Sequence, residues 1–462
     1  MQQYYEPHLG YRLPAGTEMT GKLLGEILAD HRSRLLPRYE GLRDAYEGKH
    51  AILAKPPKDK YKPDNRLVTN FQRQIVDTMV GYFLGVPVRL SGDGSPESDA
   101  AVEWLEDWGA RVGSDDLDAE LSKTCDIYGS AYEVMWRDAD ALPRSSVATP
   151  MGCLMVFDDT VARRPMYAVR FFLDTNRFDG EADCLRGTLY TPTEEIPFED
   201  RGGIRFGDAT PHGFPGVPVV EYVENEERRG LFEGVESLID AYEDAISEKA
   251  NDVDYYADAY LAILGAKLDE QTLNALRDNR IINLSGSDAD KVLVQFLSKP
   301  EADGTQENLL SRLERLIYSL SMVADISDED FGTASGIAIR YRLQAMSDLA
   351  LVKERKFRRG LRERWRLLFG YAANTQVADG EWLVVTPIFT RNLPTNLVEE
   401  AQVAAQLSGI VSEETQLSVL SCVESPSDEI ARKAGEADEA AAAVTFPREA
   451  AQQPDEGGEE EA

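Results

Sequence analysis

Residues 231–264 read LFEGVESLIDAYEDAISEKANDVDYYADAYLAIL and contain neither proline nor a cluster of turn-forming residues. Only Gly234 could weaken a helix there, so the stretch predicts one helix roughly 50 Å long at about 1.5 Å rise per residue. Its apolar stripe comprises Leu231, Val235, Leu238, Ile239, Tyr242 and Ile246. Carboxylates crowd the remaining surface, with Lys249 as the single base. Because like charges four residues apart destabilise an isolated helix, the acidic side should face water or cationic partners.

The sequence after this helix predicts a small insert and two further helices. Residues 265–300 contain a short helix, DEQTLNALRDN, and two strands, IINL and KVLVQFL, joined by SGSDAD. ENLLSRLERLIYSLSMVA then predicts a second helix with one apolar face. The acidic, glycine-containing loop from Asp325 to Gly336 ends it, and Ser335 is a suitable N-cap for a third long helix.

That third helix is basic in an otherwise acidic chain. Its cations are Lys353, Arg355, Lys356, Arg358, Arg359, Arg362, Arg364 and Arg366. Glu354 and Glu363 are interspersed, and the cations cover every face of the helix. We therefore favour pairing with acidic surface, within or between subunits, over contact with DNA.

Upstream, the chain predicts helices followed by a mixed sheet. Short helical stretches over 21–48 precede a Lys/Pro-rich connector, AKPPKDKYKPD. A helix with Val68, Ile75 and Phe83 on one face should end at Gly85, and another lies around Ala100 to Trp108. Short apolar runs separated by Gly, Pro and Asp make residues 126–225 β-rich.

Downstream of the basic helix, WLVVTPIF predicts a strand. Small helices should follow, beginning at Asn396, at Ser412 and around Pro426 to Asp428. The last residues, AAQQPDEGGEEEA, have the acidic, low-complexity composition of a disordered tail.

The net charge of −33 argues against ordinary binding of nucleic acid, which needs a basic surface. Two interpretations remain: an acidic protein kept soluble by self-repulsion, or one that touches DNA and must not hold it. Neither the cysteines nor the histidines show metal-ligand spacing, so the sequence predicts no cofactor or metal, reduced thiols and histidines on the surface or in loops. These residues are Cys125, Cys153, Cys184 and Cys422 together with His8, His31, His50 and His212.

Motifs of common enzymes are absent from the sequence. It has no phosphate-binding G-x-x-x-x-G-K-[ST] loop, no H-E-x-x-H and no G-x-S-x-G. The acidic pairs at Asp158–Asp159 and Asp328–Asp330 could bind a divalent ion, but such pairs are expected by chance at this composition. We therefore expect a structural protein and not an enzyme, with no catalytic residue.

Four blocks, in the same order, resemble portal proteins of bacteriophages with long non-contractile tails. They are NRLVTNFQRQIVDTMVGYFLGVPV (65–88), GLFEGVESLIDAYEDAISEKANDVDYYADAYLAILG (230–265), FGTASGIAIRYRLQAMSDLALVKERKFRRGL (331–361) and RNLPTNLVEEAQVAAQLSGIVSEETQLSVL (391–420). The resemblance covers roughly residues 60 to 435. Thr333 and Ala334 depart from the Asn-Ser that the family pattern leads us to expect.

The resemblance implies an α+β, mainly α, portal fold assembled as a ring of probably twelve subunits, with wing, stem, clip and crown. The regions it implies are: 1–230, the N-terminal part of the wing; 231–264, a stem helix; 265–301, the clip; 302–324, the second stem helix; 325–336, the tunnel loop; 337–395, the long helix and wing return; 396–435, the crown; and 436–462, the acidic tail.

The resemblance also implies a function: a channel at one capsid vertex for packaging and ejection of double-stranded DNA without sequence specificity. The tunnel-loop residues would be Asp325, Ser327, Asp328, Glu329, Asp330, Phe331, Gly332, Thr333, Ser335 and Gly336. The clip residues that bind partners would be Asp269, Glu270, Arg277, Arg280 and Lys291. Implied partners are other copies of the chain, the terminase large subunit, the head–tail adaptor, and the major capsid and scaffold proteins, with no membrane. The protein would be found in the virion and, during assembly, in the host cytoplasm.

Two alternatives remain from the sequence alone. One is a non-portal head or adaptor component, although adaptors are generally shorter and lack this order of elements. The other is an acidic intracellular enzyme, which no motif in the sequence supports.

Overall fold

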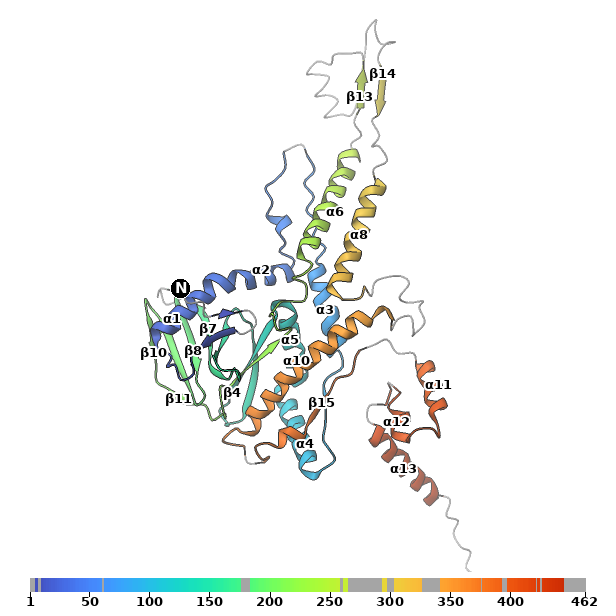
Figure 1. Ribbon diagram of the computed structural model, residues 1–462. Helices are drawn as coiled ribbons and strands as arrows, with labels where there is room; N and C mark the ends of the chain where they lie inside the picture. The colour runs from blue at the N-terminus through green and yellow to red at the C-terminus, as the bar shows by residue number, and fades with distance from the viewer. Residues whose placement is uncertain are drawn as a thin grey trace, which may run out of the picture. The chain divides into compact units, whose positions relative to one another are not determined.

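The structure is a computed structural model, shown in Figure 1. It describes residues 5–6, 10–59, 62–175, 183–257, 261–264, 293–296, 303–325, 341–374, 376–392, 397–420, 422–423 and 426–443. The chain divides into two compact units. Unit 1 comprises Met1–Thr333 and Arg340–Asn392, and unit 2 comprises Ala334–Ile339 and Leu393–Ala462.

Helices near the N-terminus follow the prediction for residues 21–48. α1 (Gly21–Asp30) begins where the Thr20 hydroxyl accepts the Leu23 N–H at 3.2 Å. It continues through the π-helix η1 (His31–Leu35) into α2 (Leu36–Tyr46). Proline is tolerated in the first turn of α2 because that N–H has no partner in the helix. The short 3-10 helix η2 (Ala51–Ala54) then leads into the Lys/Pro-rich connector.

Three further helices follow, and the first two pack against the third. α3 (Phe71–Leu84) buries Ile75, Met79 and Phe83 completely and ends at Gly85, as predicted. α4 (Pro96–Val112) and α5 (Ser114–Tyr128) follow, and the predicted helix around residues 100–108 is confirmed within α4.

Gly129 makes the turn from α5 into β4. Its φ is +84°, and a Cβ there would lie 2.1 Å from the carbonyl oxygen of Arg228. Only glycine fits this left-handed position against backbone.

The β-rich region forms two sheets and confirms the predicted mixed character. The larger sheet contains β1 (Tyr5–Glu6), β2 (Gly10–Leu13), β6 (Cys153–Asp158), β7 (Pro165–Asp174), β8 (Cys184–Tyr190), β9 (Glu194–Asp200), β10 (Ile204–Phe206) and β11 (Thr210–Pro211). Strands β2 and β6 are parallel, and the other pairs are antiparallel. The smaller sheet has the order β12 (Val219–Val223), β4 (Ser130–Arg137), β5 (Pro143–Ala148).

The stretch predicted as one helix over 231–264 differs from the structure at both ends. Helix α6 spans Glu236–Ala257, and residues 231–235 form turns before it. Leu261–Leu264 is the strand β13, which pairs antiparallel with β14 (Leu293–Phe296). The predicted strand in KVLVQFL is therefore confirmed, whereas IINL lies outside the described residues. An apolar run of four residues is compatible with either a strand or a helix. The neighbouring strand with which it pairs decides between the two.

The second predicted helix is confirmed as α8 (Asp303–Ser321). It packs side by side with α6 (Figure 1). The third is confirmed as α10 (Gln344–Phe369), which packs on strand β12. A Cβ on Gly360 would meet the Tyr222 ring at 2.3 Å, so glycine allows this close approach of α10 to β12.

After α10 the predicted strand WLVVTPIF is only partly confirmed. Residues Glu381–Val384 form the 3-10 helix η5, and β15 (Thr386–Ile388) pairs with β3 (Arg89–Ser91). In unit 2, α11 (Leu397–Leu407), α12 (Glu413–Leu417) and α13 (Pro426–Ala443) confirm the small helices. Ser412 caps α12 as predicted, and Asn396 lies outside the described residues. Because α13 continues to Ala443, the tail predicted from residue 436 begins too early.

The predicted α+β class, with more residues in helices than in strands, is confirmed. No helix in the described part of the chain is long and apolar enough to cross a membrane.

Candidate functional site: the paired helices α6 and α8

Two polar contacts and one aromatic ring join α6 to α8. Lys249 forms an ion pair with Glu307, and the Gln306 amide donates to Asp252 Oδ2 at 3.1 Å. Phe71, the first residue of α3, lies against both helices. Its ring centroid is 5.1 Å from that of Tyr242 on α6 and 5.8 Å from that of Tyr318 on α8, edge-on in both cases. The pair is thus anchored at this position to the core of unit 1.

The Lys/Pro-rich connector supplies cations to the acidic face of α6. Lys55 forms an ion pair with Asp244, and Lys58 Nζ lies 2.6 Å from Glu248 Oε1. The sequence predicts that this face meets water or cationic partners, and at Asp244 and Glu248 the structure provides cationic partners from the same chain. The sequence analysis missed this pairing, although Asp244 and Glu248 are one helical turn apart and two lysines stand in the connector.

The connector then returns along α6 through backbone contacts. The Asn65 N–H donates to Asn251 Oδ1 at 2.6 Å, and the Leu67 N–H donates to Ser247 Oγ at 2.9 Å. These bonds satisfy backbone donors that no sheet or helix pairs. They also hold the segment that leads into α3 against the acidic helix.

A buried histidine, His50, also contacts α6. His50 Nδ1 lies 2.6 Å from Glu243 Oε1, and Nε2 lies 2.8 Å from the carbonyl oxygen of Ala45. Both partners are acceptors, so only the imidazolium form donates to both. Burial lowers the pKa of His50, but the hydrogen bonds to Glu243 and Ala45 outweigh burial and raise it overall. His50 is therefore a cation that links the N-terminal helices to α6.

The stability of this link should depend on pH. Because the pKa of His50 is raised on folding, its contribution is complete below the unfolded value of about 6.5 and is lost as pH rises through the folded value. We expect His50→Gln to reduce the free energy of unfolding by about 1 to 2 kcal/mol near pH 6 and by less near pH 9. Urea unfolding of the wild-type and variant proteins at both pH values measures the difference.

His31 provides the matched control. Burial lowers its pKa to about 4, so it is neutral above pH 6.5, and its Nε2 donates a hydrogen bond to Pro150 O at 2.8 Å. The effect of His31→Gln should therefore stay constant between about pH 7 and pH 9. A His50→Gln effect that is equally constant over this range would contradict a cationic His50.

Carboxyl groups crowd the described surface of the pair. Burial, together with neighbouring carboxylates, raises the pKa values of Glu236 and Asp240 on α6. On α8, burial and then Asp325 raise the pKa values of Glu314 and Tyr318. The first residue of the predicted tunnel loop thus lies close to the end of α8, where it adds to the negative charge.

Of the predicted site residues, the structure describes Asp325 alone. The other tunnel-loop residues, from Ser327 to Gly336, lie outside the described residues. All five predicted clip residues, Asp269, Glu270, Arg277, Arg280 and Lys291, lie outside them as well. Their placement stays a prediction.

The acidic pair Asp158–Asp159 has a structural role. Asp158 Oδ1 accepts from the Thr160 hydroxyl at 2.7 Å and from the Arg164 N–H at 3.1 Å, and the Thr160 bond lowers the pKa of Asp158. Asp159 Oδ1 accepts from the Ala15 N–H at 3.3 Å. Asp158 therefore stabilises the turn after β6, and Asp159 ties this turn to the segment after β2. No group of three His, Cys, Asp or Glu side chains within the described ranges is arranged to hold a metal ion.

The prediction that the histidines lie on the surface or in loops is wrong for His31, which is buried within η1, whereas His50 and His212 lie in loops as predicted, although both are buried. His31, His50 and His212 are buried, each with a hydrogen-bond partner, and His8 lies outside the described residues. Isolated histidines in sequence carry no periodic signal that separates a core position from a loop. All four cysteines are free thiols.

Most cations of α10 pair with acidic groups, as the sequence analysis favoured. Lys353 binds Asp126 and Glu224, and Arg364 binds Asp118 and Glu133. Lys356, Arg358 and Arg366 pair with Glu226, Glu354 and Glu363 respectively. The pairing lies within the subunit and leaves Arg355, Arg359 and Arg362 exposed.

The α+β body of unit 1 thus carries a pair of carboxylate-rich helices. A family model described as "Phage portal protein, SPP1 Gp6-like" matches residues 26–443. The match covers most of the chain, which therefore belongs to this family of bacteriophage portal proteins, the head–tail connectors of the virion. The resemblance seen in the four sequence blocks is thereby confirmed.

Two portal proteins are similar along most of their length. That of Bacillus phage SPP1 is 26% identical over 397 residues, covering 81% of this chain and 76% of its own. That of Clostridium phage phiCD119 is 20% identical over 370 residues, covering 75% and 79%. A solved structure described as "Neck of empty GTA particle computed with C6 symmetry" is 13% identical with a TM-score of 0.47, covering 82% of this chain and 93% of the other.

Proposed function

We propose that this chain forms a closed ring at one capsid vertex, through which double-stranded DNA enters during packaging and leaves during ejection. The observation that carries the proposal is the family match over residues 26–443. The acidic helices α6 and α8 support it, because a channel wall dense in carboxylates repels the phosphates of DNA. Translocating DNA then meets no deep binding minimum in the wall.

Within this ring, α6 and α8 would be the stem, and the body of unit 1 would be the wing. The segment 265–301 would be the clip, docking first the terminase motor and later the head–tail adaptor. Residues 325–336 would be the tunnel loop nearest to DNA, and 396–435 the crown. The region boundaries follow the resemblance, with the stem helices limited to the bounds of α6 and α8.

The same proposal covers partners and location. Capsid and scaffold proteins would contact the ring in the virion, and the subunits would assemble in the host cytoplasm. The protein would be a conduit and would catalyse no reaction itself.

Electron microscopy of the purified protein tests the proposal. We expect class averages along the particle axis to show closed rings of about twelve subunits with a central hole wide enough for a duplex. A reconstruction should place residues 325–336 at the narrowest part of the channel. Rings with this segment on the outer surface would overturn the loop assignment alone. A small closed oligomer without a channel, at high protein concentration and at both low and high salt, would overturn the whole proposal.

A further inference from the structure

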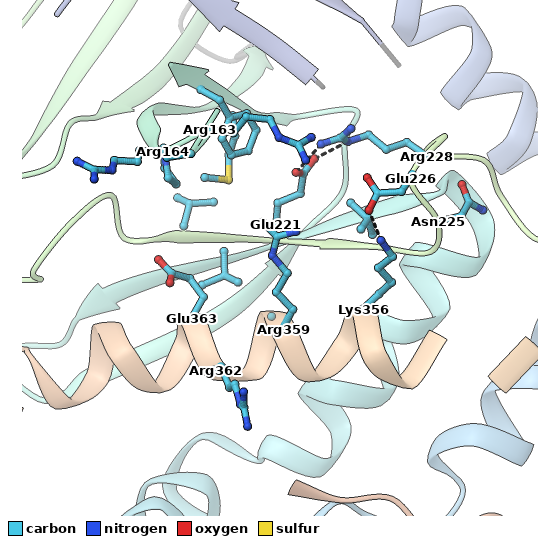
Figure 2. Close-up of a pocket in the computed structure, with 18 of the residues that line it drawn as sticks. Arg163, Arg164, Glu221, Asn225, Glu226, Arg228, Lys356, Arg359, Arg362 and Glu363 are labelled. Carbon is cyan, nitrogen blue, oxygen red and sulfur yellow. Dashed lines mark hydrogen bonds and ion pairs between the residues drawn. The ribbon is translucent and has the colours of Figure 1, made fainter. Parts of the chain in front are cut away.

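A pocket lined by several cations lies beside α10 and is drawn in Figure 2. The pocket has a volume of about 430 Å³ and lies between α10, strand β12 and the loop that joins β6 to β7. Its rim includes Trp382 and Leu383 of η5, and Leu383 is 65% exposed. Six cations line it against three carboxylates, in a chain whose net charge is −33. The cations are Arg163, Arg164, Arg228, Lys356, Arg359 and Arg362.

All three carboxylates of this pocket already have cationic partners. Glu221 binds Arg228 through two bonds of 2.8 and 2.9 Å, and Glu226 binds Lys356. Glu363 binds Arg366 at 2.7 Å. The pocket therefore holds more cations than carboxylates.

Two arginines of the pocket form no hydrogen bond or ion pair in the described part of the subunit, although Arg359, after Lys356, helps to lower the pKa of Glu226. Arg359 and Arg362 are exposed and form no hydrogen bond or ion pair with any described residue. In Figure 2, Arg359 points toward the pocket and Arg362 lies on the opposite side of the α10 ribbon. Arg355, also exposed, precedes Arg359 by one turn. We call Arg355, Arg359 and Arg362 the arginine stripe, since their spacing of four and three residues makes them neighbours along the surface of α10, with the Arg359 side chain turned toward the pocket and that of Arg362 turned away from it.

A stripe of opposite charge and equal spacing lies on α4. Asp99, Glu103 and Glu106 are separated by four and three residues, and all three are exposed. None of them forms an ion pair or side-chain hydrogen bond with the described residues. We call these residues the carboxylate stripe. Each stripe spans about 10 Å along its helix axis, so charges can match one to one.

We propose that the arginine stripe of one subunit binds the carboxylate stripe on α4 of a second copy of this chain. Such a contact joins two different surfaces and is therefore heterologous, the type that closes into a ring. The inference rests on the ring proposed above and names the surfaces that form it. Burial of Leu383 at the rim would add apolar contact to the paired charges.

Charge complementarity favours α4 over α6. The carboxylates of α6 are partly neutralised within the subunit by Lys55, Lys58 and Lys249. The carboxylate stripe of α4 forms no such ion pairs with the described residues. The pairing also gives the three arginines of the arginine stripe counter-charges, which no ion pair within the described part of their own subunit supplies.

Charge reversal on each side, and on both, tests the contact in the full-length chain. We expect Arg359→Glu with Arg362→Glu, and separately Glu103→Arg with Glu106→Arg, to raise the concentration needed for ring formation at least about tenfold near physiological salt. The four changes combined should restore ring formation to within about threefold of wild type. The fraction of rings is measured by analytical ultracentrifugation and electron microscopy. The defect of the arginine variant should shrink as salt rises, because screening weakens the repulsion.

A matched control changes the net charge equally at a distant site. Lys22→Glu with Arg32→Glu replaces two exposed cations of the N-terminal helices that form no ion pair with described residues, and it should assemble as wild type does. Thermal unfolding of every variant identifies failure to fold. If the arginine variant unfolds early, Arg359→Gln with Arg362→Gln takes its place, with a smaller assembly defect expected.

Each other result overturns the inference. Normal rings from either two-residue variant would show that the stripes do not meet. Failure of the combined variant to recover, with its melting temperature unchanged, would do the same. Normal rings accompanied by loss of binding to a short DNA duplex would assign the arginine stripe to nucleic acid. If the wild-type protein forms no ring under any condition, the proposed function itself fails, which these variants do not decide.

Discussion

Arg364→Met is expected to reduce the free energy of unfolding by about 3 to 5 kcal/mol. Arg364 is buried in α10, and its guanidinium lies 2.8 Å from Glu133 Oε2 and 2.6 Å from Asp118 Oδ1. Glu133 also accepts from the Tyr222 hydroxyl at 2.8 Å. Removal of the cation leaves two buried carboxylates without a counter-charge, which costs more than the lost attraction alone.

The loss should depend on pH in a defined direction. Burial already raises the pKa of Asp118, although Arg364 opposes the rise. Without Arg364 the folded pKa rises further above the unfolded value, and the deficit grows as pH rises above that unfolded value. We therefore expect a smaller deficit near pH 5 than near pH 8, measured by urea unfolding.

A rescue separates the charge effect from simple loss of packing. The combined change Arg364→Met, Asp118→Asn and Glu133→Gln removes the whole ionic set and should recover most of the lost stability. Arg32→Met, at an exposed position without an ion pair to described residues, should change the free energy of unfolding by less than about 0.5 kcal/mol. An Arg364→Met deficit that is independent of pH and is not relieved by the rescue would contradict this account.

Lys353→Met should have an effect of similar size, about 3 to 5 kcal/mol. Lys353 is buried about three turns before Arg364 on the same side of α10, where Nζ binds Asp126 and lies 2.9 Å from Glu224 Oε2. Burial lowers the pKa of this amine, but the two carboxylates outweigh burial and raise it. The lysine joins α10 to the end of α5 and to the turn after β12.

The matching rescue is Lys353→Met with Asp126→Asn and Glu224→Gln. We expect it to restore most of the stability lost by the single change, again measured by urea unfolding. Burial raises the pKa of Asp126 well above its ordinary value, because it disfavours the charged carboxylate. Replacement by asparagine therefore removes a charge that is unfavourable at this buried position. If the single change proves harmless, Lys353 does not hold α10 to the body of unit 1.

The sequence by itself determined the elements with a long, regular pattern. The apolar stripe ending at Gly85 predicted α3, and the acidic and basic runs predicted the cores of α6 and α10. Helical periodicity over many residues leaves one face for the core, so these predictions need no knowledge of neighbours. The order of the four blocks was also sufficient for the family.

The tertiary structure alone decided which charges meet. Nothing in the sequence near Asp118 or Glu133 selects Arg364, 246 and 231 residues away along the chain, over the other cations of α10. The connector lysines, His50 with Glu243, and the strand identity of Leu261–Leu264 likewise depend on partners distant in sequence. A charge or a short apolar run is compatible with many partners, and only the packing of the backbone brings one of them within bonding distance.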